Sequence, residues 1–311
     1  MNEPLVYIVT LNWNGFSDTY ELIESLTKIT YKNFKIIVVD NNSANDEAEK
    51  IENLCRGKAH LIKCKENLGF SGGNNVGIKY SLEKKADYIL LLNNDTTVEP
   101  DFLEILLKTF ETYSQAGIVA PRINYYNEPK KIWSEGGKVS WLRGSGFAYS
   151  DKLETEVNRI DRSVTFVSGC CMLIKSEVFS KIGLFDENYF LYTEDTDFCI
   201  RAVKAGYKIY LTPGSKIFHK VNMSTKGSYS TLPLYYTTRN RLYFAKKNFP
   251  KFYFITVTYI FLTMILKSIK WILTGKLKNI AAVQKAFYDF FFGKMGKTDH
   301  SFFLSEKTNK E

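Results

Sequence analysis

Apolar and polar positions alternate along the first part of the chain in two patterns. Short runs rich in Val, Ile and Leu predict buried strands, and longer segments with apolar residues three and four apart predict amphipathic helices. The expected strands are 5–11, 34–40, 60–64 and 88–92, and the expected helices are 17–28, 72–85 and 101–113. Strands that alternate with helices predict an α/β fold with a mostly parallel sheet covered on both faces.

The pattern is less regular in the middle of the chain. Residues 118–167 are rich in Gly and polar residues, which predicts loops and short antiparallel strands near a site. Strand character returns at 164–175. Residues 193–207 are expected to form a helix that Thr193 caps, with acidic residues in its first turn.

The C-terminal part of the chain is strongly basic. From Arg239 to the end there are 14 Lys and Arg and 4 Asp and Glu, a balance of +10, whereas the preceding 238 residues sum to −1. This asymmetry predicts an anionic partner. The change in charge predicts a domain at residues 1–238 and a basic helical region at residues 239–311.

An uncharged run at 252–266 is flanked by lysines. As a helix it is about 22 Å long at ~1.5 Å per residue, which is less than the ~30 Å hydrocarbon core of a bilayer. The run therefore favours a helix that lies in the interface of an anionic membrane. A buried core or dimer helix and a spanning helix stay open as alternatives.

The composition argues against a disordered chain, a disulfide-bonded protein and a nucleic-acid-binding protein. The chain of 311 residues is 45% apolar and 15% aromatic, which is typical of a folded protein with a sizeable core. Its five cysteines lack Cys-x-x-Cys spacing, which indicates free thiols in a reducing cytosol. No nucleic-acid partner is expected, because the basic residues of the tail interleave with an apolar run rather than a stacking platform.

Hydrogen-bonding side chains follow three of the expected strands where each strand ends. Each end alone is typical of an ordinary loop. Because the carboxyl ends of parallel strands meet at one edge of a sheet, we expect these side chains to gather there. Their hydroxyl, amide and carboxylate groups suit a pyrimidine ring, and an Asp with oxygen neighbours can hold a hard divalent cation. The residues are Thr10, Asn12, Asp40, Asn93, Asn94 and Asp95.

Two further segments are candidates for the site. Residues 67–78 are glycine-rich and lead into an expected helix, whose N-terminus favours phosphate; a plain helix start is an equal alternative. Residues 190–201 place Glu194, Asp195 and Asp197 within four positions. The helix dipole favours acids there by about 0.3–1 kcal/mol each, but three acids exceed what capping requires, so one is a candidate general base.

Seven segments, in order over residues 5–245, together resemble glycosyltransferase family 2, whose members are inverting, nucleotide-sugar-dependent enzymes with the GT-A fold. Within that family the chain looks most like the rhamnosyltransferase-like branch that builds bacterial surface polysaccharides. The segments are VTLNWNG, VVDNNS, NLGFSGGNNVGI, LLLNNDTTV, VSGCCMLIKSEVFSKIGLFDENYFLYTEDTDFCIR, His219 and YYTTRNR.

The resemblance implies metal-dependent transfer of one sugar, with dTDP-rhamnose as the expected donor, to a hydroxyl of a lipid-linked saccharide at the cytoplasmic face of the cell membrane. A transferase of UDP-galactose, UDP-N-acetylglucosamine or UDP-galactofuranose and a non-catalytic nucleotide-sugar-binding relative are the alternatives. The Q-x-x-R-W motif of processive synthases is absent, which favours one sugar per encounter. A homodimer through the C-terminal region is also left open.

The resemblance also implies a role for each matching residue. Asp195 is the expected general base. Asp95 and His219 are the expected ligands of Mg²⁺ or Mn²⁺, and an imidazole ligand favours Mn²⁺. Asn93 stands where the family has the first Asp of its Asp-x-Asp motif, so this neutral amide is expected to contact ribose or phosphate.

The other expected contacts are with substrates. Those assigned to the nucleotide are Thr10, Asn12, Asp40, Asn42, Asn67, Phe70, Asn74, Asn75 and Asn94. Trp133 is assigned to the donor sugar, and Gly169 and Glu194 are assigned to the acceptor. Arg239 and Arg241 are assigned to a diphosphate.

Overall fold

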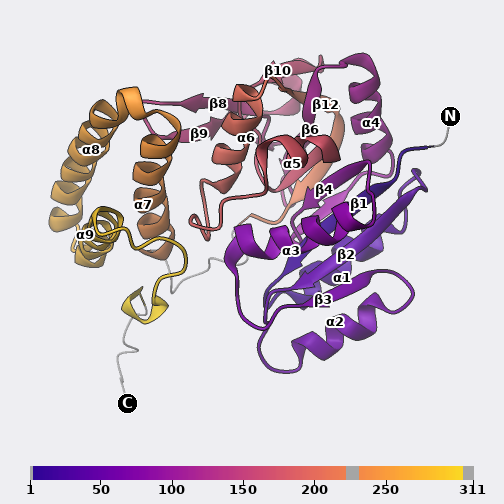
Figure 1. Cartoon of the computed structure of the whole chain (residues 1–311), viewed down its shortest axis with the longest axis horizontal. Helices are drawn as coiled ribbons and strands as arrows, with labels where there is room; N and C mark the ends of the chain where they lie inside the picture. The colour runs from indigo at the N-terminus through magenta and orange to yellow at the C-terminus, as the bar shows by residue number, and fades with distance from the viewer. Residues whose placement is uncertain (1–2, 222–230, 304–311) are drawn as a thin grey trace.

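The computed structural model describes residues 3–221 and 231–303 (Figure 1). Most of its strands belong to one large sheet, and β8 and β9 form a separate hairpin. The strands are β1 Val6–Asn12, β2 Phe34–Asp40, β3 His60–Lys63, β4 Tyr88–Leu92, β5 Thr96–Val98, β6 Ala116–Tyr125, β7 Ile132–Ser134, β8 Gly137–Ser140, β9 Ser145–Ala148, β10 Arg162–Val164, β11 Cys171–Lys175 and β12 Lys208–His219.

Helices cover the sheet and continue beyond it. The α-helices are α1 Phe16–Leu26, α2 Glu47–Cys55, α3 Gly69–Glu83, α4 Phe102–Thr112, α5 Ser176–Ile182, α6 Glu194–Lys204, α7 Thr231–Asn248, α8 Tyr253–Leu273 and α9 Leu277–Phe291. Short 3₁₀ helices are η1 Glu154–Glu156, η2 Pro250–Phe252 and η3 His300–Phe303.

The strand order of the large sheet is β10-β12-β6-β11-β4-β1-β2-β3, with β5 paired to β12 and β7 paired to β6. Strands β3, β2, β1 and β4 are parallel. Strand β11 runs antiparallel between β4 and β6, so the sheet is mixed beyond β4. The predicted α/β class is confirmed, and the parallel half aligns the carboxyl ends of β1, β2 and β4.

Two hydrophobic clusters lie on the two faces of this sheet. Alternate residues of β1 point to opposite faces, so Ile8 joins one cluster and Val9 joins the other. The first cluster contains residues of α1, α2 and α4, and the second contains residues of α3, α5 and α6. Burial on both faces explains why the predicted strands read as continuous apolar runs.

The predicted elements of the N-terminal half are confirmed, most within three residues at each end. Two expectations for the middle of the chain were wrong. Residues 116–125 form β6, a long buried strand inside the segment expected to be irregular. The single strand expected at 164–175 is interrupted: β10 ends at Val164 and β11 begins at Cys171, because residues 168–171 form a turn in which Gly169 N–H donates to Asp195 of α6.

The C-terminal helices stand beside the sheet, with α8 and α9 packed on α7 (Figure 1). Helix α7 also packs on α6, and it runs through the predicted division at residue 238. The segment Pro250–Leu273 has a mean hydropathy of 1.7 and only 17% of its apolar window is buried. By length and composition it is able to cross a membrane.

Candidate active site

The carboxyl ends of β1 and β2 form a network of polar side chains. Asn12 lies opposite Asp40 in the parallel register. Asn12 Nδ2 donates to Asp40 Oδ1 at 3.1 Å and to Ser43 Oγ at 3.0 Å, and Ser43 Oγ donates to Asp40 Oδ1 at 2.6 Å. Thr19 of α1 donates to Asn12 Oδ1 at 2.9 Å. These contacts hold Asp40 in one orientation at the sheet edge, where the sequence predicted that these side chains gather.

Thr10 and Asn42, which were predicted to lie near this network, differ in their exposure to solvent. Thr10 is fully buried, and within the described residues its hydroxyl has no hydrogen-bond partner. Asn42 is exposed and has a positive φ of 62°, a conformation that Asn tolerates in tight turns. Asn42 is therefore accessible to a ligand at this edge, whereas Thr10 lies beneath it.

Asn41, which sequence reasoning did not single out, organises the loop before α3. Its side chain donates to Asn67 Oδ1 and to the Gly69 carbonyl, both at 3.1 Å, and accepts from Leu68 N–H at 2.9 Å. Asn67 in turn accepts from Gly69 N–H at 2.8 Å. The sequence signal that could have identified Asn41 was the run of amide side chains in VVDNNS, because Asn41 lies within it.

Phe70, at the start of α3, is tied to the loop that carries the acidic cluster. Its N–H donates to the Phe190 carbonyl at 2.7 Å. Gly69 has a φ of +71°, and a Cβ there would lie 2.3 Å from the Phe190 carbonyl oxygen. Only glycine permits this close approach, which brings the glycine-rich segment against the acidic loop.

The structure corrects the role expected of Asn75. It is 1% exposed, and its Nδ2 donates to the Phe185 carbonyl at 2.9 Å and to Glu187 Oε1 at 2.8 Å. Phe185 N–H donates back to Asn75 Oδ1 at 3.0 Å. Asn75 thus anchors a distant loop to α3 instead of facing a nucleotide. Asn74 donates to the Phe70 carbonyl, one helical turn earlier, at 2.9 Å.

Asp95 and His219 meet at the ends of β4 and β12. Asp95 Oδ1 lies 3.1 Å from His219 Nε2. This is about the separation of two adjacent ligands of an octahedral cation with ~2.1 Å bonds. Among residues 3–221 and 231–303, no third His, Cys, Asp or Glu completes a metal cluster. The two side chains are hydrogen-bonded to each other, and their spacing would also suit two ligands of one cation.

The surroundings of His219 are apolar and tightly packed. Trp133 lies edge-on to its ring with centroids 4.4 Å apart. Within the described residues His219 Nδ1 is buried and has no hydrogen-bond partner. Without a cation, burial disfavours the imidazolium, but Cys170 and Asp95 outweigh it and raise the pKa of His219 to about 10. A cation would have to displace the Nε2 proton before His219 could ligate it. Trp133 therefore positions His219, a role the sequence did not predict.

The amides that precede Asp95 make different contacts. Asn93 N–H donates to the Cys170 carbonyl at 2.9 Å, which leaves its half-buried side chain at the sheet edge. Asn94 Nδ2 donates to Thr19 Oγ1 at 3.0 Å and to the Gly15 carbonyl at 3.3 Å. Asn94 therefore joins the end of β4 to α1.

The acidic cluster lies at the start of α6, after an unusual backbone segment. Phe190, Tyr192 and Thr193 all have positive φ, at 59°, 67° and 77°. Such conformations cost non-glycine residues of order 1–3 kcal/mol each and persist only where surrounding contacts hold them. Thr193 precedes the helix, as predicted, but its side chain makes no cap hydrogen bond.

Asn240 of α7 makes contacts that hold this backbone segment in place. It is fully buried, and its Nδ2 lies 2.8–2.9 Å from the carbonyl oxygens of Tyr189, Leu191 and Tyr192. Asn240 belongs to the YYTTRNR segment, but the sequence indicated no role for it. The structure shows that the C-terminal region holds the loop that leads into the acidic cluster.

Asp195 lies between this loop and β11. Its Oδ2 accepts from Gly169 N–H at 3.1 Å, and its Oδ1 accepts from Thr196 N–H at 2.6 Å. A Cβ on Gly169 would lie 3.2 Å from the Phe70 ring and 3.4 Å from the Asp195 side chain, so glycine leaves room there. Burial raises the pKa of Asp195, although these hydrogen bonds oppose the rise.

Glu194 is buried beside Asp195. Within the described residues its Oε2 has no hydrogen-bond partner. Burial, together with the charge of Asp195, raises the pKa of Glu194 well above its usual range. Two adjacent carboxyl groups with raised pKa values are candidates for a role in proton transfer. Asp197, in contrast, is bound by Arg201 and Asn248 and serves the fold.

The two arginines expected to bind diphosphate have different environments. Arg239 is 1% exposed, and its guanidinium donates to Tyr235 Oη at 3.1 Å and to the Gly296 carbonyl at 2.9 Å. These contacts give Arg239 a structural role and correct the expectation. Arg241 is only half-buried, and its Nε donates to the Arg143 carbonyl at 2.7 Å.

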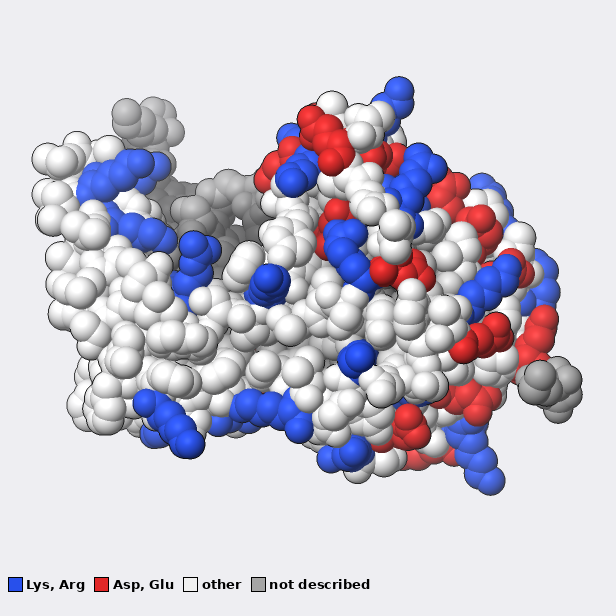
Figure 2. All heavy atoms as spheres, turned by 90° about the horizontal axis from the view of Figure 1, so that it is seen from above, with Lys and Arg blue, Asp and Glu red and all other residues white. Residues whose placement is uncertain are grey.

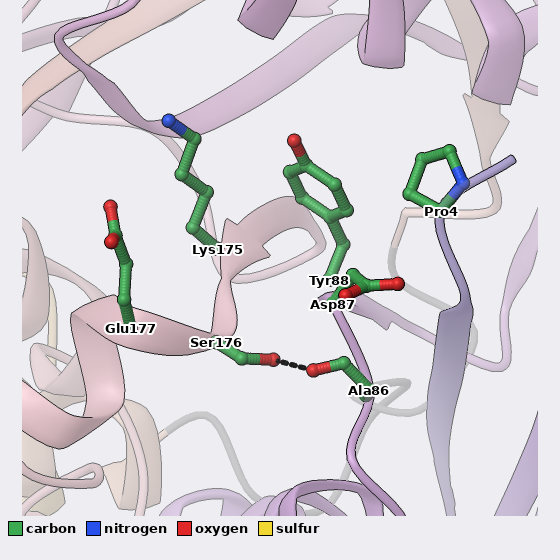
Figure 3. A pocket seen from close by; sticks show the side chains of 7 residues that line it. All are labelled: Pro4, Ala86, Asp87, Tyr88, Lys175, Ser176 and Glu177. Atoms are coloured by element: carbon green, nitrogen blue, oxygen red, sulfur yellow. Dashed lines mark hydrogen bonds between the residues drawn. The ribbon is translucent and has the colours of Figure 1, made fainter. Parts of the chain in front are cut away.

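A surface hollow lies at the opposite end of the sheet (Figure 3). It is lined by Pro4, Ala86, Asp87, Tyr88, Lys175, Ser176 and Glu177, and Ser176 donates to the Ala86 carbonyl across it. These residues lie before β1, before or at the start of β4, at the end of the antiparallel β11 and at the start of α5. They are therefore far from the carboxyl ends of the parallel strands. Ligands of α/β sheets bind at the carboxyl ends, so this hollow is not the candidate site.

A comparison with known families identifies the family of this chain. Residues 6–183 match the sequence profile of Glycosyl transferase family 2. The chain belongs to this family. The matched region contains the strand-end network, Asp95 and Gly169, and the chain is accordingly a glycosyltransferase.

Two relatives share sequence with most of this glycosyltransferase. The chain is 25% identical to dTDP-rhamnosyl transferase RfbF of Shigella flexneri over 256 residues, which cover 78% of this chain and 80% of the relative. It is 25% identical over 240 residues to N-acetylglucosaminyl-diphospho-decaprenol L-rhamnosyltransferase of Mycobacterium tuberculosis, with coverage of 70% and 76%. The predicted resemblance to rhamnosyltransferases of this family is confirmed.

A solved structure shares the fold. The crystal structure of GalNAc-T7 with UDP, GalNAc and Mn²⁺ superposes with a TM-score of 0.58 at 14% identity. The match covers 78% of this chain and 51% of that chain, so the glycosyltransferase spans about half the length of GalNAc-T7. The predicted GT-A fold is confirmed.

Proposed function

We propose that this glycosyltransferase moves one sugar, rhamnose from dTDP-rhamnose, to a hydroxyl of a lipid-linked saccharide in bacterial surface polysaccharide synthesis. The observation that carries the proposal is the convergence of three groups at one sheet edge. These are the Asn12–Asp40 network, the Asp95–His219 pair and the half-buried carboxyl of Asp195. The rhamnosyltransferase names of the relatives support the choice of donor.

The nucleotide would bind at the ends of β1 and β2. Asp40 accepts a hydrogen bond from a ring N–H of thymine or uracil, and Asn42 and Asn67 lie beside it. Asn12 and Ser43 hold Asp40 in place for this contact. Because the two bases present the same edge to these residues, a UDP-sugar is the alternative donor.

Asp95 and His219 would hold Mg²⁺ or Mn²⁺ at the diphosphate. When bound, the cation supplies positive charge that stabilises the leaving nucleoside diphosphate. Asn93 lies beside this pair and contributes an amide to ribose or phosphate. The packing of Trp133 on His219 fixes the imidazole and borders the space for the donor sugar.

Asp195 would act as the general base in a single displacement. It accepts the proton of an acceptor hydroxyl while that oxygen bonds to the anomeric carbon. The bond from the anomeric carbon to the diphosphate oxygen breaks on the opposite side, so the configuration inverts. Hydrogen bonds from Gly169 and Thr196 aim the carboxylate. Glu194, the preceding residue, would contact the acceptor.

The C-terminal helices would bind the cytoplasmic face of an anionic membrane, where a lipid-linked acceptor resides. Apolar side chains of α8 and α9 are exposed, among them Phe254 at 81% and Leu266 at 68%. The space-filling view shows Lys and Arg over these helices, whereas acidic residues gather over the other end of the molecule (Figure 2). Exposed apolar groups flanked by lysines are typical of an interfacial helix. The division into a catalytic part and a membrane-associating part follows from this proposal.

A donor screen tests the proposed function. Release of nucleoside diphosphate is measured from dTDP-rhamnose, UDP-galactose, UDP-N-acetylglucosamine and UDP-galactofuranose, with Mg²⁺, with Mn²⁺ and with EDTA. We expect metal-dependent release from dTDP-rhamnose above the other donors. Preference for a UDP-sugar would replace the donor assignment, and no release from any donor would favour a non-catalytic relative.

A further inference from the structure

The side chain of Asn240, which holds the loop at residues 188–193, is oriented by its neighbour Arg239. Arg239 Nε and Nη2 each lie 3.2 Å from Asn240 Oδ1. A guanidinium group only donates hydrogen bonds and a carbonyl oxygen only accepts them, so the amide oxygen must face Arg239 and the amide nitrogen must face the loop. In this orientation Asn240 Nδ2 reaches three carbonyl oxygens of the loop. Arg239 therefore determines which way the Asn240 amide points.

The chain that follows α9 holds Arg239 and also contacts the loop. Arg239 Nη2 donates to the Gly296 carbonyl at 2.9 Å. Gly296 N–H donates to the Asn188 carbonyl at 2.8 Å, and the same carbonyl lies 3.5 Å from Arg239 Nη2. These bonds join the end of α9, helix α7 and the start of the loop at one arginine.

Aromatic contacts extend from Arg239 toward Asp195. The guanidinium lies over the Tyr236 ring, 5.0 Å from its centroid. Tyr236 stacks on Phe190 of the loop with centroids 5.4 Å apart. The Phe190 carbonyl accepts from Phe70 N–H at 2.7 Å, and the Phe70 ring borders the turn that donates to Asp195. The loop is thus packed between Arg239 and the surroundings of Asp195.

The environment of Arg239 indicates that its fork of donors matters more than its volume. In the described part of the chain, Arg122, which is equally buried, pairs with Glu135, whereas Arg239 pairs with no carboxylate. A buried cation without a carboxylate costs free energy, which its bonds to carbonyl groups and the faces of Tyr235 and Tyr236 offset only in part. An apolar side chain would fill the same space at lower cost but would leave the Asn240 amide free to turn.

The loop needs these contacts because its backbone is strained. Phe190, Tyr192 and Thr193 have positive φ, which such residues keep only where surrounding contacts hold them. Without the bonds from Asn240 this segment would relax toward ordinary backbone conformations. Asp195 is two residues beyond Thr193, so relaxation would move its carboxylate from the position that it holds in this structure.

We propose that Arg239 is a positioning residue for Asp195 and acts through Asn240. The inference rests on the proposed function, because it requires Asp195 to be the general base. Arg239 itself contacts neither donor nor acceptor, and its effect on transfer comes from the loop that Asn240 holds. The C-terminal helices are therefore part of the catalytic geometry as well as of the proposed membrane contact.

Arg239→Lys tests the role of the fork. Lysine keeps the positive charge but lacks the planar pair of donors that faces Asn240 Oδ1. We expect turnover with a lipid-linked acceptor to fall about 10–100-fold, because a small misplacement of a reacting group costs up to ~10²-fold. Affinity for dTDP should not change. Wild-type turnover would overturn the proposal, and an equal loss of turnover and dTDP affinity would assign Arg239 to the donor and also overturn it.

A double variant separates positioning from general stability. If Arg239 acts through Asn240, then Asn240→Ala already removes the group that Arg239 orients. Adding Arg239→Lys should then reduce turnover by much less than it does in the wild type. Losses that multiply in full would overturn the proposal. Arg239→Gln, which buries no charge, takes the place of Arg239→Lys if the lysine variant does not fold.

Tyr235→Phe is the matched control on α7. It removes the hydroxyl to which Arg239 Nη1 donates at 3.1 Å and leaves the bonds to Asn240 intact. It should lower the melting temperature and keep turnover near that of the wild type. A loss of turnover as large as that of Arg239→Lys would attribute the effect to stability and overturn the proposal.

Hydrogen exchange provides a readout that does not depend on transfer. In Arg239→Lys the backbone amides of residues 188–197 should exchange faster, whereas those of α1 should not change. Unchanged protection of residues 188–197 would overturn the proposal. If that protection falls as expected while Asp195→Asn keeps wild-type turnover, Arg239 does position the loop and only the assignment of the general base is wrong.

Discussion

Replacing Asp195 with Asn separates a catalytic role from a structural one. The side chain accepts hydrogen bonds from Gly169 N–H and Thr196 N–H. Asn keeps the shape and one acceptor, so one of these bonds is lost, at a cost of about 0.5–1.5 kcal/mol. Removal of a buried charge beside Glu194 offsets part of that cost. We therefore expect Asp195→Asn to unfold within about 4 °C of the wild type.

The effect on the rate should be far larger. Asn has no basic group to accept the acceptor proton, and loss of a positioned base costs about 10²–10⁴-fold in turnover. Affinity for the nucleoside diphosphate should stay near that of the wild type, because the Asn12–Asp40 network lies on β1 and β2 and Asp95 lies in the turn after β4, whereas Asp195 belongs to α6. Glu194→Gln is the control, with a milder loss expected.

The pH dependence provides a second readout. Burial raises the pKa of Asp195, and a general base must be deprotonated. Wild-type turnover should therefore rise with pH through a value above the ~3.9 of an ordinary Asp, as a property of the Glu194–Asp195 pair. Asp195→Asn should change this acid limb. The test compares the variant with the wild type by turnover with a lipid-linked acceptor and by calorimetric binding of dTDP. A variant that keeps turnover within threefold of wild type would refute the assignment and transfer the role to Glu194.

Three further changes test other parts of the molecule. Asp95→Ala should abolish the effect of Mg²⁺ or Mn²⁺ on dTDP binding by calorimetry; retained metal-dependent binding would exclude Asp95 as a ligand. A Phe254→Glu, Leu266→Glu double variant should lose cosedimentation with anionic vesicles at an unchanged melting temperature, whereas Tyr20→Glu, exposed on α1, should bind as the wild type does. Asn240→Ala should lower the free energy of unfolding by about 2–4 kcal/mol, since it leaves buried carbonyl groups unpaired. It should also reduce turnover more than dTDP affinity, and an equal loss of both would mean that the loop it holds also forms the donor site.

The parts of the site that follow from the sequence are those set by local pattern. Apolar runs identify β1, β2 and β4, and the polar residues just after them must lie at the carboxyl ends of the strands. The local pattern alone therefore assigns Asn12, Asp40 and Asp95 to one edge of the sheet. The same reasoning identifies α8, because an uncharged run flanked by lysines is a local property.

The remaining features depend on contacts between residues far apart in sequence. Asn75 is 110 residues from Phe185, and Asn240 is 51 from Tyr189, so no periodicity indicates either hydrogen bond. Arg239 was expected to bind a ligand because it belongs to the YYTTRNR segment that resembles the family, while the carbonyl groups that surround it become its neighbours only after folding. Packing of α7 against the acidic loop decided which polar residues face a ligand and which stabilise the protein, because a hydrogen-bonding group has the same chemistry in either role.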